Sequence, residues 1–483
     1  MLLYNSLGRR KEEFIPVRPG HARVYVCGIT AYDYSHLGHA RAAVVFDVLV
    51  RHLRLAGLDT LYIRNFTDID DKILARAQAE GRDWRELGSF FMRAFHEDMD
   101  RLGVQRPDLE PRATDFIQSI IDLCKILIDR KLAYVAENGD VYYRVRANSQ
   151  YGKLSGRSLD DMQVGARVSP GEEKEDPLDF ALWKAAKPGE PSWKAPWGNG
   201  RPGWHIECSA MNQPFLPLDI HGGGQDLIFP HHENEIAQSE AAFDCALARY
   251  WVHNGFVRVN SEKMSKSLGN FETIRAILEN WLPETLRFFL LTKHYRSPLD
   301  FTPDSMAEAE KGQRRIYAAL SEVKSALAHG KWKKTALPRE LIEEWAETDR
   351  LYHEGMDDDL NTALALGQIF SAARLVNRLL EDRKTRNLAE SGQIYEDFLE
   401  RARRWQAELG LFGAAPEEFL ENLRKMRVKR LKLDVAWINE KLAARQTARA
   451  SKDYAASDAL RNELAASGIS VRDTAAGQEW DVE

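Results

Sequence analysis

The chain has 483 residues, 44% hydrophobic and 29% charged, which is enough to bury the cores of two to four domains. Its formal net charge of −6 argues against a protein that coats nucleic acid in general, although it allows a local basic face. Only 4 cysteines are present, which excludes a disulfide scaffold and favours a reducing, cytoplasmic location. We expect neither a signal peptide nor a membrane-spanning segment.

The amino-terminal part alternates between strand and helix patterns. Residues 23–27 and 60–66 are short apolar runs typical of buried strands, and between them a helical pattern runs toward Leu55 and stops at Gly57. A strand, a crossover helix and a second strand predict a parallel α/β unit. Helical periodicity then dominates from about residue 85 to 135.

The rest of the chain divides by composition. Residues of about 134–202 form strands and loops rich in Gly, Pro and Trp, which predicts a subdomain inserted into the α/β domain. From about Ala307 onward the chain is almost wholly helical, with polar breaks at 330–338 and 410–416. The Asp run at 357–359 is expected to be a solvated acidic cap at a helix start. The predicted domains are therefore an α/β domain over 1–306, a helical bundle over 307–410 and a small terminal domain over 411–483.

Residues 36–39 read His-Leu-Gly-His and stand where the first predicted strand passes into a helix. A helix N-terminus offers unpaired N–H groups and a partial positive charge, so it favours phosphate. His36 and His39 add donors, and Gly38 lets a flat base approach the backbone. Alone, this tetrapeptide also fits an ordinary helix start.

Residues 263–267 read Lys-Met-Ser-Lys-Ser and are followed by Leu-Gly-Asn. In such a loop, Lys263 and Lys266 can close on a polyphosphate and stabilise the charge that develops in a transition state. The alternative reading is a solvated basic loop.

A glycine-rich segment at 221–226 follows another predicted strand. Gly223 and Gly224 would let a nucleotide approach the backbone closely, and Asp226 would accept hydrogen bonds from ribose hydroxyls. The alternative is a plain glycine turn.

Cys27, Cys208, His231 and Glu235 are the residues of the chain best suited to a metal. Two thiolates, an imidazole and a carboxylate suit a tetrahedral Zn²⁺, and residues four apart, such as His231 and Glu235, share one face of a helix. Taken singly, a buried cysteine is usually inert. That is the interpretation for Cys124, which lies in an apolar helical stretch.

Together these motifs resemble a known family. Residues 36–39 look like the "HIGH" motif of class I aminoacyl-tRNA synthetases, and residues 263–267 match their "KMSKS" loop letter for letter. Further segments resemble cysteinyl-tRNA synthetases and stand in that family's order: 25–28, 67–72, 203–211 and 229–235. The resemblance continues more weakly to the C-terminus.

The resemblance implies a Rossmann-like α/β catalytic domain with a parallel sheet and an inserted subdomain, then an α-helical bundle and a small anticodon-binding domain. It implies a monomeric ligase that activates L-cysteine with ATP and Mg²⁺, releases pyrophosphate, and transfers the cysteinyl group to the 3′-terminal ribose of tRNA-Cys. It also implies one Zn²⁺ per chain, held by Cys27, Cys208, His231 and Glu235.

The resemblance further assigns roles to individual residues. Its catalytic groups are His36, His39, Lys263 and Lys266. Its ATP-binding residues are Gly38, Gly223, Gly224, Asp226 and Lys266. Its amino acid pocket is formed by Thr67, Trp204 and His221.

A metal suits this task because cysteine and serine differ by a single atom. Accuracy of about 10⁴–10⁵ requires about 5.5–7 kcal/mol, which a shape pocket cannot supply for such similar groups. Thiolate is the preferred soft ligand of zinc and a hydroxyl is not. We therefore predict selection by sulfur, without a hydrolytic editing domain.

The C-terminal segment 421–472 contains 12 Lys and Arg and 6 Asp and Glu, so this segment carries a net positive charge although the whole chain is negative. Such an asymmetry suits a surface that faces phosphates. The resemblance implies four readers of unpaired anticodon bases: Arg445, Arg449, Asp458 and Asp473. An ordinary amphipathic helix with charged faces is the alternative.

Two other functions fit part of the pattern. A ligase that joins cysteine to an amino-sugar, as in mycothiol synthesis, resembles this core but lacks a full tRNA domain, so the chain beyond Leu411 disfavours it. A nucleic-acid-binding protein with a dead catalytic core is disfavoured by the intact histidines and lysines of the two ATP motifs.

Overall fold

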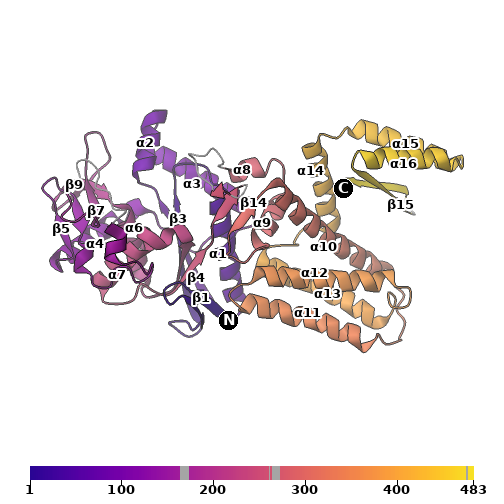
Figure 1. The fold of residues 1–483 in the computed structure, drawn as a ribbon, viewed down its shortest axis with the longest axis horizontal. Coiled ribbons are helices and arrows are strands. Elements are labelled where there is room, and N and C mark those ends of the chain that lie inside the picture. The colour runs from indigo at the N-terminus through magenta and orange to yellow at the C-terminus, as the bar shows by residue number, and fades with distance from the viewer. Residues whose placement is uncertain (164–172, 260–261, 264–271, 475–476, 483) are drawn as a thin grey trace.

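The structure is a computed structural model that describes residues 1–163, 173–259, 262–263, 272–474 and 477–482. The molecule is elongated, with the α/β part at one end and the helical part at the other (Figure 1). Among the described residues, none of the helices combines the length and apolar character needed to cross a bilayer.

The central sheet has four parallel strands in the order β11 (Ala248–Asn254), β10 (Leu218–Gly224), β3 (His21–Thr30) and β4 (Asp59–Thr67). The predicted parallel α/β unit is confirmed, because α1 (Leu37–Leu55) connects β3 to β4. From β10 the chain runs outward in the other direction, through α7 (Glu233–Phe243) to β11. The strand order therefore reverses between β3 and β10, and ligands of open α/β sheets bind outside the carboxyl ends of strands at such a point.

The two faces of this sheet pack against different elements. Val24 and Val26 lie in the large core cluster that includes the apolar side of α1. Tyr25 faces the other way and packs in a cluster with Cys208 of α6 (Trp204–Asn212). Because side chains alternate along a strand, Cys27 falls on the α6 side of β3.

Three helices follow β4: α2 (Asp71–Glu80), α3 (Trp84–Arg101) and α4 (Ile117–Asp129). They confirm the helical periodicity predicted up to about residue 135, with a break between α3 and α4. Cys124 of α4 is fully buried in an apolar cluster, as predicted.

An antiparallel sheet packs against α4. Its strands, in spatial order, are β5 (Ala133–Val135), β6 (Val141–Tyr143), β7 (Phe180–Ala185), β9 (Gly198–Pro202) and β8 (Trp193–Ala195), and the short helix α5 (Leu159–Gln163) lies between β6 and β7 in the chain. The predicted strand-and-loop character is confirmed. The apolar cluster around Trp183 gives this part a core of its own.

A small three-stranded sheet follows β11: β13 (Glu262–Lys263), β12 (Val257–Val259) and β14 (Leu299–Phe301), with α8 (Ile274–Ile277) and α9 (Pro283–Leu291) between β13 and β14 in the chain. Two backbone hydrogen bonds tie the start of α8 to the start of α1. Leu37 N donates to Glu272 O at 3.2 Å, and Ile274 N donates to Ser35 O at 3.0 Å. The chain that leaves the lysine-rich motif is therefore fixed beside residues 36–39.

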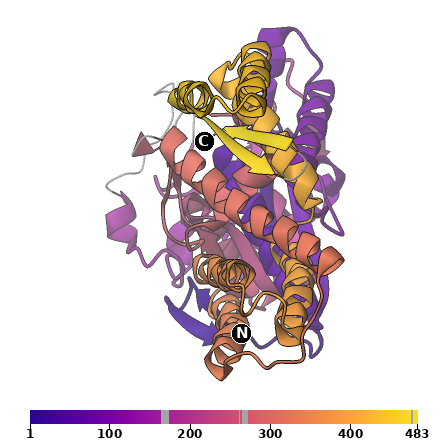
Figure 2. The ribbon, with the colours of Figure 1, turned by 90° about the vertical axis from the view of Figure 1, so that its right-hand side faces the viewer.

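The bundle consists of α10 (Pro303–His329), α11 (Arg339–Asp357), α12 (Thr362–Glu381) and α13 (Ala389–Leu409), and Figure 2 looks onto this end of the molecule, with α10 running obliquely across the view. α10 runs without a break through the division proposed at 306/307. The expectation that the Asp run is a solvated cap is wrong for Asp359, which is fully buried and binds Tyr295 and Arg296. Asn361 caps α12 instead.

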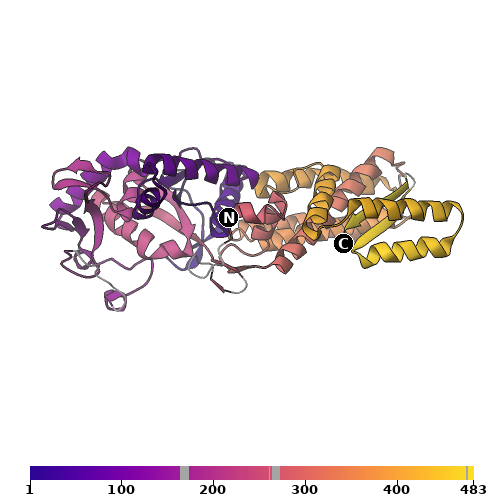
Figure 3. The same cartoon turned by 90° about the horizontal axis from the view of Figure 1, so that it is seen from above.

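The last part contains α14 (Pro416–Leu431), α15 (Val435–Ala450), α16 (Tyr454–Ala466), β15 (Ile469–Thr474) and β16 (Gly477–Val482). In Figure 3, α15 and α16 project beyond the bundle. The expectation of an almost wholly helical C-terminal part is wrong here, because β15 and β16 form an antiparallel hairpin. A second hairpin, β1 (Leu2–Asn5) and β2 (Arg10–Glu13), opens the chain.

Candidate functional site

A cavity of about 420 Å³ lies at the carboxyl ends of β3 and β10. Its walls come from β3, α1, β4, α6 and the segment after β10. Five of the residues predicted to handle ATP line it: His36, Gly38, His39, Gly224 and Asp226. The fold thus brings together segments that lie almost 190 residues apart in the sequence.

The N-terminus of α1 fixes its two histidines beside this cavity. His36 is the N-cap residue, and its Nδ1 accepts a hydrogen bond from Gly38 N–H at 3.0 Å. His39 Nδ1 accepts from His36 N–H at 3.3 Å, and the two rings stack with centroids 3.7 Å apart. Both imidazoles are therefore held at the positive end of the helix dipole, where an anion is stabilised.

Gly28 is required by the close approach of β3 and β4. A Cβ atom there would lie 1.5 Å from the carbonyl oxygen of Asn65. The same asparagine accepts a hydrogen bond from Gly28 N–H at 2.8 Å through its side chain. Gly28 also lines the cavity, so this contact shapes the wall beside Cys27.

Gly223 is not among the described residues that line the cavity. A side chain at this position would lie 2.8 Å from Leu227 and 3.0 Å from the His232 ring. The glycine therefore makes room for the turn after β10, and its contact with ATP stays a prediction.

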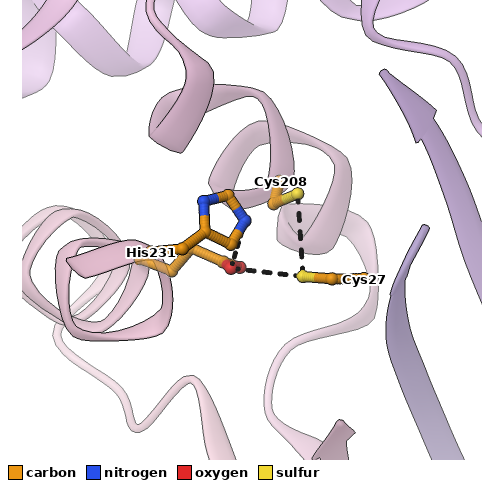
Figure 4. Close-up of side chains that lie close together, drawn as sticks. Cys27, Cys208 and His231 are labelled. Atoms are coloured by element: carbon orange, nitrogen blue, oxygen red, sulfur yellow. Dashed lines mark hydrogen bonds and ion pairs between the residues drawn. The ribbon is translucent and has the colours of Figure 1, made fainter. Parts of the chain in front are cut away.

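The four predicted metal ligands converge beside the cavity (Figure 4). They come from four elements: the end of β3, α6, the kinked turn Ile228–His232 and α7. The sulfurs of Cys27 and Cys208 are 3.9 Å apart, and Glu235 Oε1 lies 3.4 Å from the Cys27 sulfur and 3.1 Å from His231 Nε2. All four donor atoms lie within 4.8 Å of one another.

These separations suit a zinc ion. Zinc–ligand bonds of about 2.0–2.3 Å in a tetrahedron place neighbouring donor atoms about 3.3–3.8 Å apart. The spacings above lie close to that range, and the donors are two sulfurs, one nitrogen and one oxygen. The residues present therefore fit the metal that the sequence implies.

The electrostatics of the cluster favour the charged forms of Cys208, His231 and Glu235, whereas burial and the neighbouring Cys208 and Glu235 raise the pKa of the Cys27 thiol well above its usual value. The hydrogen bond from Cys27, with help from His231, lowers the pKa of Cys208 to about 6. Burial disfavours charged His231, but Glu235 and Cys208 outweigh it and raise the pKa of that imidazole to about 10. Burial likewise opposes ionisation of Glu235, yet His221 and His231 hold the pKa of that carboxyl well below its usual range. A metal cation can replace the protons held by this buried set of thiol, carboxyl and imidazole groups.

Neighbouring side chains orient the second oxygen of Glu235. His221 Nε2 lies 3.0 Å from Oε2, and Asn212 Nδ2 donates to the same oxygen at 3.2 Å. Oε1 is thereby left facing the sulfur and imidazole donors. Such contacts fix ligand geometry in metal sites. Asn212 was missed from the sequence, although its position four residues after Cys208 on α6 places it on the same helix face.

A second overlapping group also has metal-ligand spacing: Cys27, His221, His232 and Glu235. It offers only one thiolate, and His232 Nδ1 already lies 2.8 Å from His253 Nε2. Since zinc favours thiolate-rich sets, the group with both cysteines is the better fit.

Family models cover most of the chain. Residues 13–311 match the model described as tRNA synthetases class I (C) catalytic domain, and residues 352–413 match the DALR domain. Residues 436–480 match the cysteinyl-tRNA ligase anticodon binding domain.

Curated relatives match end to end. A cysteine–tRNA ligase of Desulfovibrio desulfuricans is 65% identical, and one of Nitratidesulfovibrio vulgaris is 60% identical, each over 100% of both chains. The chain belongs to the cysteinyl-tRNA synthetase family. The resemblance on which the sequence analysis relied is confirmed.

Solved structures support the same fold. The Mycobacterium tuberculosis methionyl-tRNA synthetase in complex with methionyl-adenylate is similar with a TM-score of 0.62 at 16% identity, covering 80% of this chain and 92% of that one. A putative arginyl-tRNA synthetase from Campylobacter jejuni gives 0.55 at 13% identity, covering 83% and 95%. At such identities the likeness concerns the fold alone, which is the predicted class I architecture.

Of the three residues that the cysteinyl-tRNA synthetase resemblance assigns to the amino acid pocket, only Trp204 lines the cavity. Its ring stacks on His231, with centroids 4.3 Å apart. Thr67 and His221 are buried behind the cavity wall. Thr67 Oγ1 donates to Glu207 Oε2 at 2.9 Å, so its hydroxyl is held by α6.

The lysine motif of the family is described only in part. The backbone of Lys263 lies in β13 and pairs with Arg258 of β12. Lys266 lies outside the described residues, so its predicted role stays a prediction.

Three of the four predicted anticodon readers form one network. Arg445 is buried, and its guanidinium donates to both carboxylate oxygens of Asp473, at 2.8 and 3.0 Å, and to Gln478. Arg449 donates to Asp473 at 2.5 Å. These bonds, with Arg445 first, hold the pKa of Asp473 below its usual value. Asp458 is exposed on α16. The network fixes the β15–β16 hairpin on α15, and base reading stays a prediction.

Proposed function

We propose that this chain is a cysteine–tRNA ligase that activates L-cysteine with ATP and transfers it to tRNA-Cys. The observation that carries the proposal is the position of Cys27, which belongs to the metal-ligand cluster and also lines the cavity with His36 and His39. A substrate sulfur at the cluster and a triphosphate at the start of α1 would therefore share one space.

Zinc is the proposed cofactor, held by Cys27, Cys208, His231 and Glu235. When bound, it supplies a soft ligand position that a thiolate fills far better than a hydroxyl, which separates cysteine from serine. Trp204, stacked on His231, closes the cluster toward the cavity. Thr67 and His221 support this wall from behind through Glu207 and Glu235.

The N-terminus of α1 is the proposed ATP-binding element. His36 and His39 would stabilise negative charge on the phosphates, together with the helix dipole. Asp226 would accept from the ribose hydroxyls, and Gly38, Gly223 and Gly224 would leave room for the nucleotide. Lys263 and Lys266 would close on the phosphates, and Mg²⁺ would accompany ATP, held mainly by phosphate oxygens and water.

Activation joins two substrates held in one cavity. The cysteine carboxylate attacks the α-phosphorus, the bond to the bridging oxygen breaks, and pyrophosphate leaves with the electron pair. The terminal ribose hydroxyl of the tRNA then attacks the carbonyl carbon of cysteinyl-adenylate and releases AMP. No side chain needs to form a covalent intermediate, because positioning and electrostatics suffice.

The C-terminal part favours tRNA over an amino-sugar as acceptor. Residues 436–480 match an anticodon binding domain, and a ligase that modifies a small sugar would not need such a domain. Arg445, Arg449, Asp458 and Asp473 are the proposed readers of the anticodon. We propose that the protein acts as a monomer in the cytoplasm.

The test is cysteine-dependent exchange between ATP and pyrophosphate, followed by charging of tRNA-Cys. We expect exchange with cysteine, exchange with serine lower by at least about 10⁴-fold, and formation of cysteinyl-tRNA. An amino-sugar acceptor used in preference to tRNA, or no exchange with cysteine, would contradict the proposal.

A further inference from the structure

Arg64 of β4 places a charged group with unused donors in the wall of the cavity. Its side chain is only 4% exposed, and it lines the same space as Cys27 and His36. Nη2 donates to Glu110 Oε1 at 3.2 Å, but Nε and Nη1 have no hydrogen-bond partner among the described residues. Buried donors are almost always paired in folded proteins, so these two N–H groups point to an acceptor that the chain itself does not supply.

A second unpaired donor lies close to the first. Tyr62 stands two positions before Arg64 on β4, so both side chains project from the same face of the sheet. Burial raises the pKa of Tyr62, and the charge and hydrogen bond of the neighbouring Arg64 partly offset that rise, so the hydroxyl lies beside the guanidinium. The O–H itself donates to no group in the described part of the chain. Tyr62 lines the cavity as well, so its O–H group and the N–H groups of Arg64 face one space.

Small and aromatic side chains contribute to the wall of the same cavity. Ala42 and Ala43 of α1 and Phe95 of α3 line it together with Arg64. The guanidinium carbon lies 4.8 Å from the centre of the Phe95 ring, which holds the arginine in place by a cation–π contact.

The charge of the cavity favours an anion. Arg64 and Lys72 line it, whereas Asp226 is the single carboxylate among the described lining residues. Glu110, the ion-pair partner of Arg64, is itself shared with His96, whose Nε2 lies 3.1 Å away. The guanidinium is therefore only partly neutralised, and a charge-assisted bond to an oxyanion is the interaction it is suited to make.

We infer that Arg64 is a further substrate-binding residue, whose free Nε–H and Nη1–H groups, with the Tyr62 hydroxyl, donate to an anionic oxygen of a bound substrate. The inference rests on the proposed function, since ATP and cysteine are the substrates considered. Both carry such oxygens, in the triphosphate and in the carboxylate. The triphosphate is the favoured source, because α1 places His36 and His39 at its positive end and lines the same cavity as Arg64.

The experiment compares Arg64→Met and Arg64→Lys with the wild-type chain in pyrophosphate exchange. Loss of charged hydrogen bonds in Arg64→Met should raise the KM for ATP about 10–100-fold and change the KM for cysteine less than about threefold. Arg64→Lys should recover part of the loss, since it keeps the charge. A rise in the KM for cysteine instead would assign the carboxylate as the bound oxyanion.

A matched control is Arg85→Met. Arg85 lies on α3, is largely exposed and is not among the described lining residues. Its substitution should leave both KM values unchanged. Melting temperatures of all variants separate a binding defect from a folding defect.

If Arg64→Met does not fold, Tyr62→Phe provides a second test of the same binding site. It removes one buried hydroxyl and no charge, and should raise the KM for ATP about 3–10-fold while changing the melting temperature little. KM values for ATP and cysteine within twofold of wild type in Arg64→Lys and Tyr62→Phe would overturn the inference, because buried water would then account for the free donors. Absence of exchange in the wild-type chain would count against the proposed function instead, and titration of the same variants with ATP alone would still test Arg64.

Discussion

Two buried cysteines on helices have opposite surroundings. Cys208 faces Cys27, His231 and Glu235, and its pKa falls to about 6. Cys124 lies in an apolar cluster, where burial raises the pKa of its thiol. The thiolate is the form that binds metals, so the environment rather than the residue type makes Cys208 a ligand.

Replacing Cys208 with alanine should therefore remove the metal. We expect bound zinc to fall from one per chain to less than about 0.1, and cysteine-dependent exchange to fall at least about 100-fold, because a tetrahedral site loses one of four ligands. Metal analysis of the purified variant and exchange kinetics measure both effects.

Cys124→Ala is the matched control, since it deletes an equally buried thiol. It should keep its zinc and its exchange activity while losing some stability through the cavity it leaves. Equal zinc contents in the two variants would contradict the ligand assignment.

The donor types of the metal site could be predicted from the sequence, but its geometry could not. Cys208, His231 and Glu235 stand in recognisable motifs, and the spacing of four residues places His231 and Glu235 on one helix face. Nothing local shows that this face meets the sulfurs of Cys27 and Cys208. The kinked turn that ends at His232 places His231 Nε2 beside Glu235. Asn212 and Arg64 belong to no motif, and only tertiary packing reveals their contacts.

At the scale of elements, the N-terminus of α2 joins the inserted sheet to the catalytic core. Asp71 accepts from Lys184 of β7 at 2.7 Å and from Arg201 of β9. Burial opposes ionisation of Asp71, but these cations outweigh it and keep its pKa below the usual value. The pair therefore contributes stability above the unfolded pKa of about 3.9 and loses it as pH falls through the lower folded pKa.

Asp71→Asn should thus destabilise the protein most near neutral pH. We expect a cost of no more than about 1 kcal/mol, because the carboxylate is 57% exposed and screened by solvent. The difference between variant and wild type should shrink as pH falls through the lowered folded pKa of Asp71, below which both lack the charge. Urea unfolding at several pH values measures it, and a difference independent of pH would contradict the ion-pair account.

A second joint connects α1 to the helical part. Arg287 of α9 and Asp47 of α1 form a buried ion pair in which both side chains are 1% exposed. Arg287 also donates to the carbonyl oxygen of Leu409, at the end of α13, at 2.6 Å. α1, which carries the ATP-binding histidines at its start, is therefore anchored near its middle to the bundle.

Asp47→Asn should leave the buried guanidinium without its counter-charge. Breaking such a pair costs about 3–5 kcal/mol of unfolding free energy. Chemical denaturation measures the cost. The double variant with Arg287→Met should recover part of it, and a cost below about 1 kcal/mol in the single variant would show that the pair is not a structural joint.

The strands, the crossover helix and the bundle helices could be predicted from periodicity in the sequence. The ion pairs that join these elements could not. The apolar run around Val24 and the glycine at position 57 that ends the helical pattern are local signals. Asp359 misled the prediction because an Asp run resembles a solvated cap, and only the neighbouring Tyr295 and Arg296 show that it is buried. Pairings between residues hundreds of positions apart leave no local pattern.

At the scale of the whole molecule, the C-terminal part docks on α10 through several contacts, of which one buried carboxylate binds two arginines. Glu310 accepts from Arg427 at 2.7 Å and from Arg430 at 2.9 Å, and both arginines belong to α14. Arg430 also donates to Asn280 O, close to α8, and covers Trp281. The proposed anticodon-reading part is thus held in a fixed place relative to the cavity.

Glu310→Ala should loosen this dock and separate the two half-reactions. We expect the KM for tRNA-Cys to rise about 10-fold, because two binding regions on one tRNA would lose their fixed spacing, while cysteine-dependent exchange stays within about twofold. Glu343→Ala, at an exposed ion pair on α11, is the control. Equal losses in exchange and charging would contradict a role confined to tRNA placement.

The central claim is that zinc, held by these four residues, meets the sulfur of the incoming cysteine. X-ray absorption at the zinc edge, with and without L-cysteine, tests it most directly. The account predicts two sulfur and two lighter ligands in the free protein, and an additional sulfur at about 2.3 Å with cysteine but not with serine. A protein that contains no zinc, or a sulfur count that cysteine does not change, would contradict it.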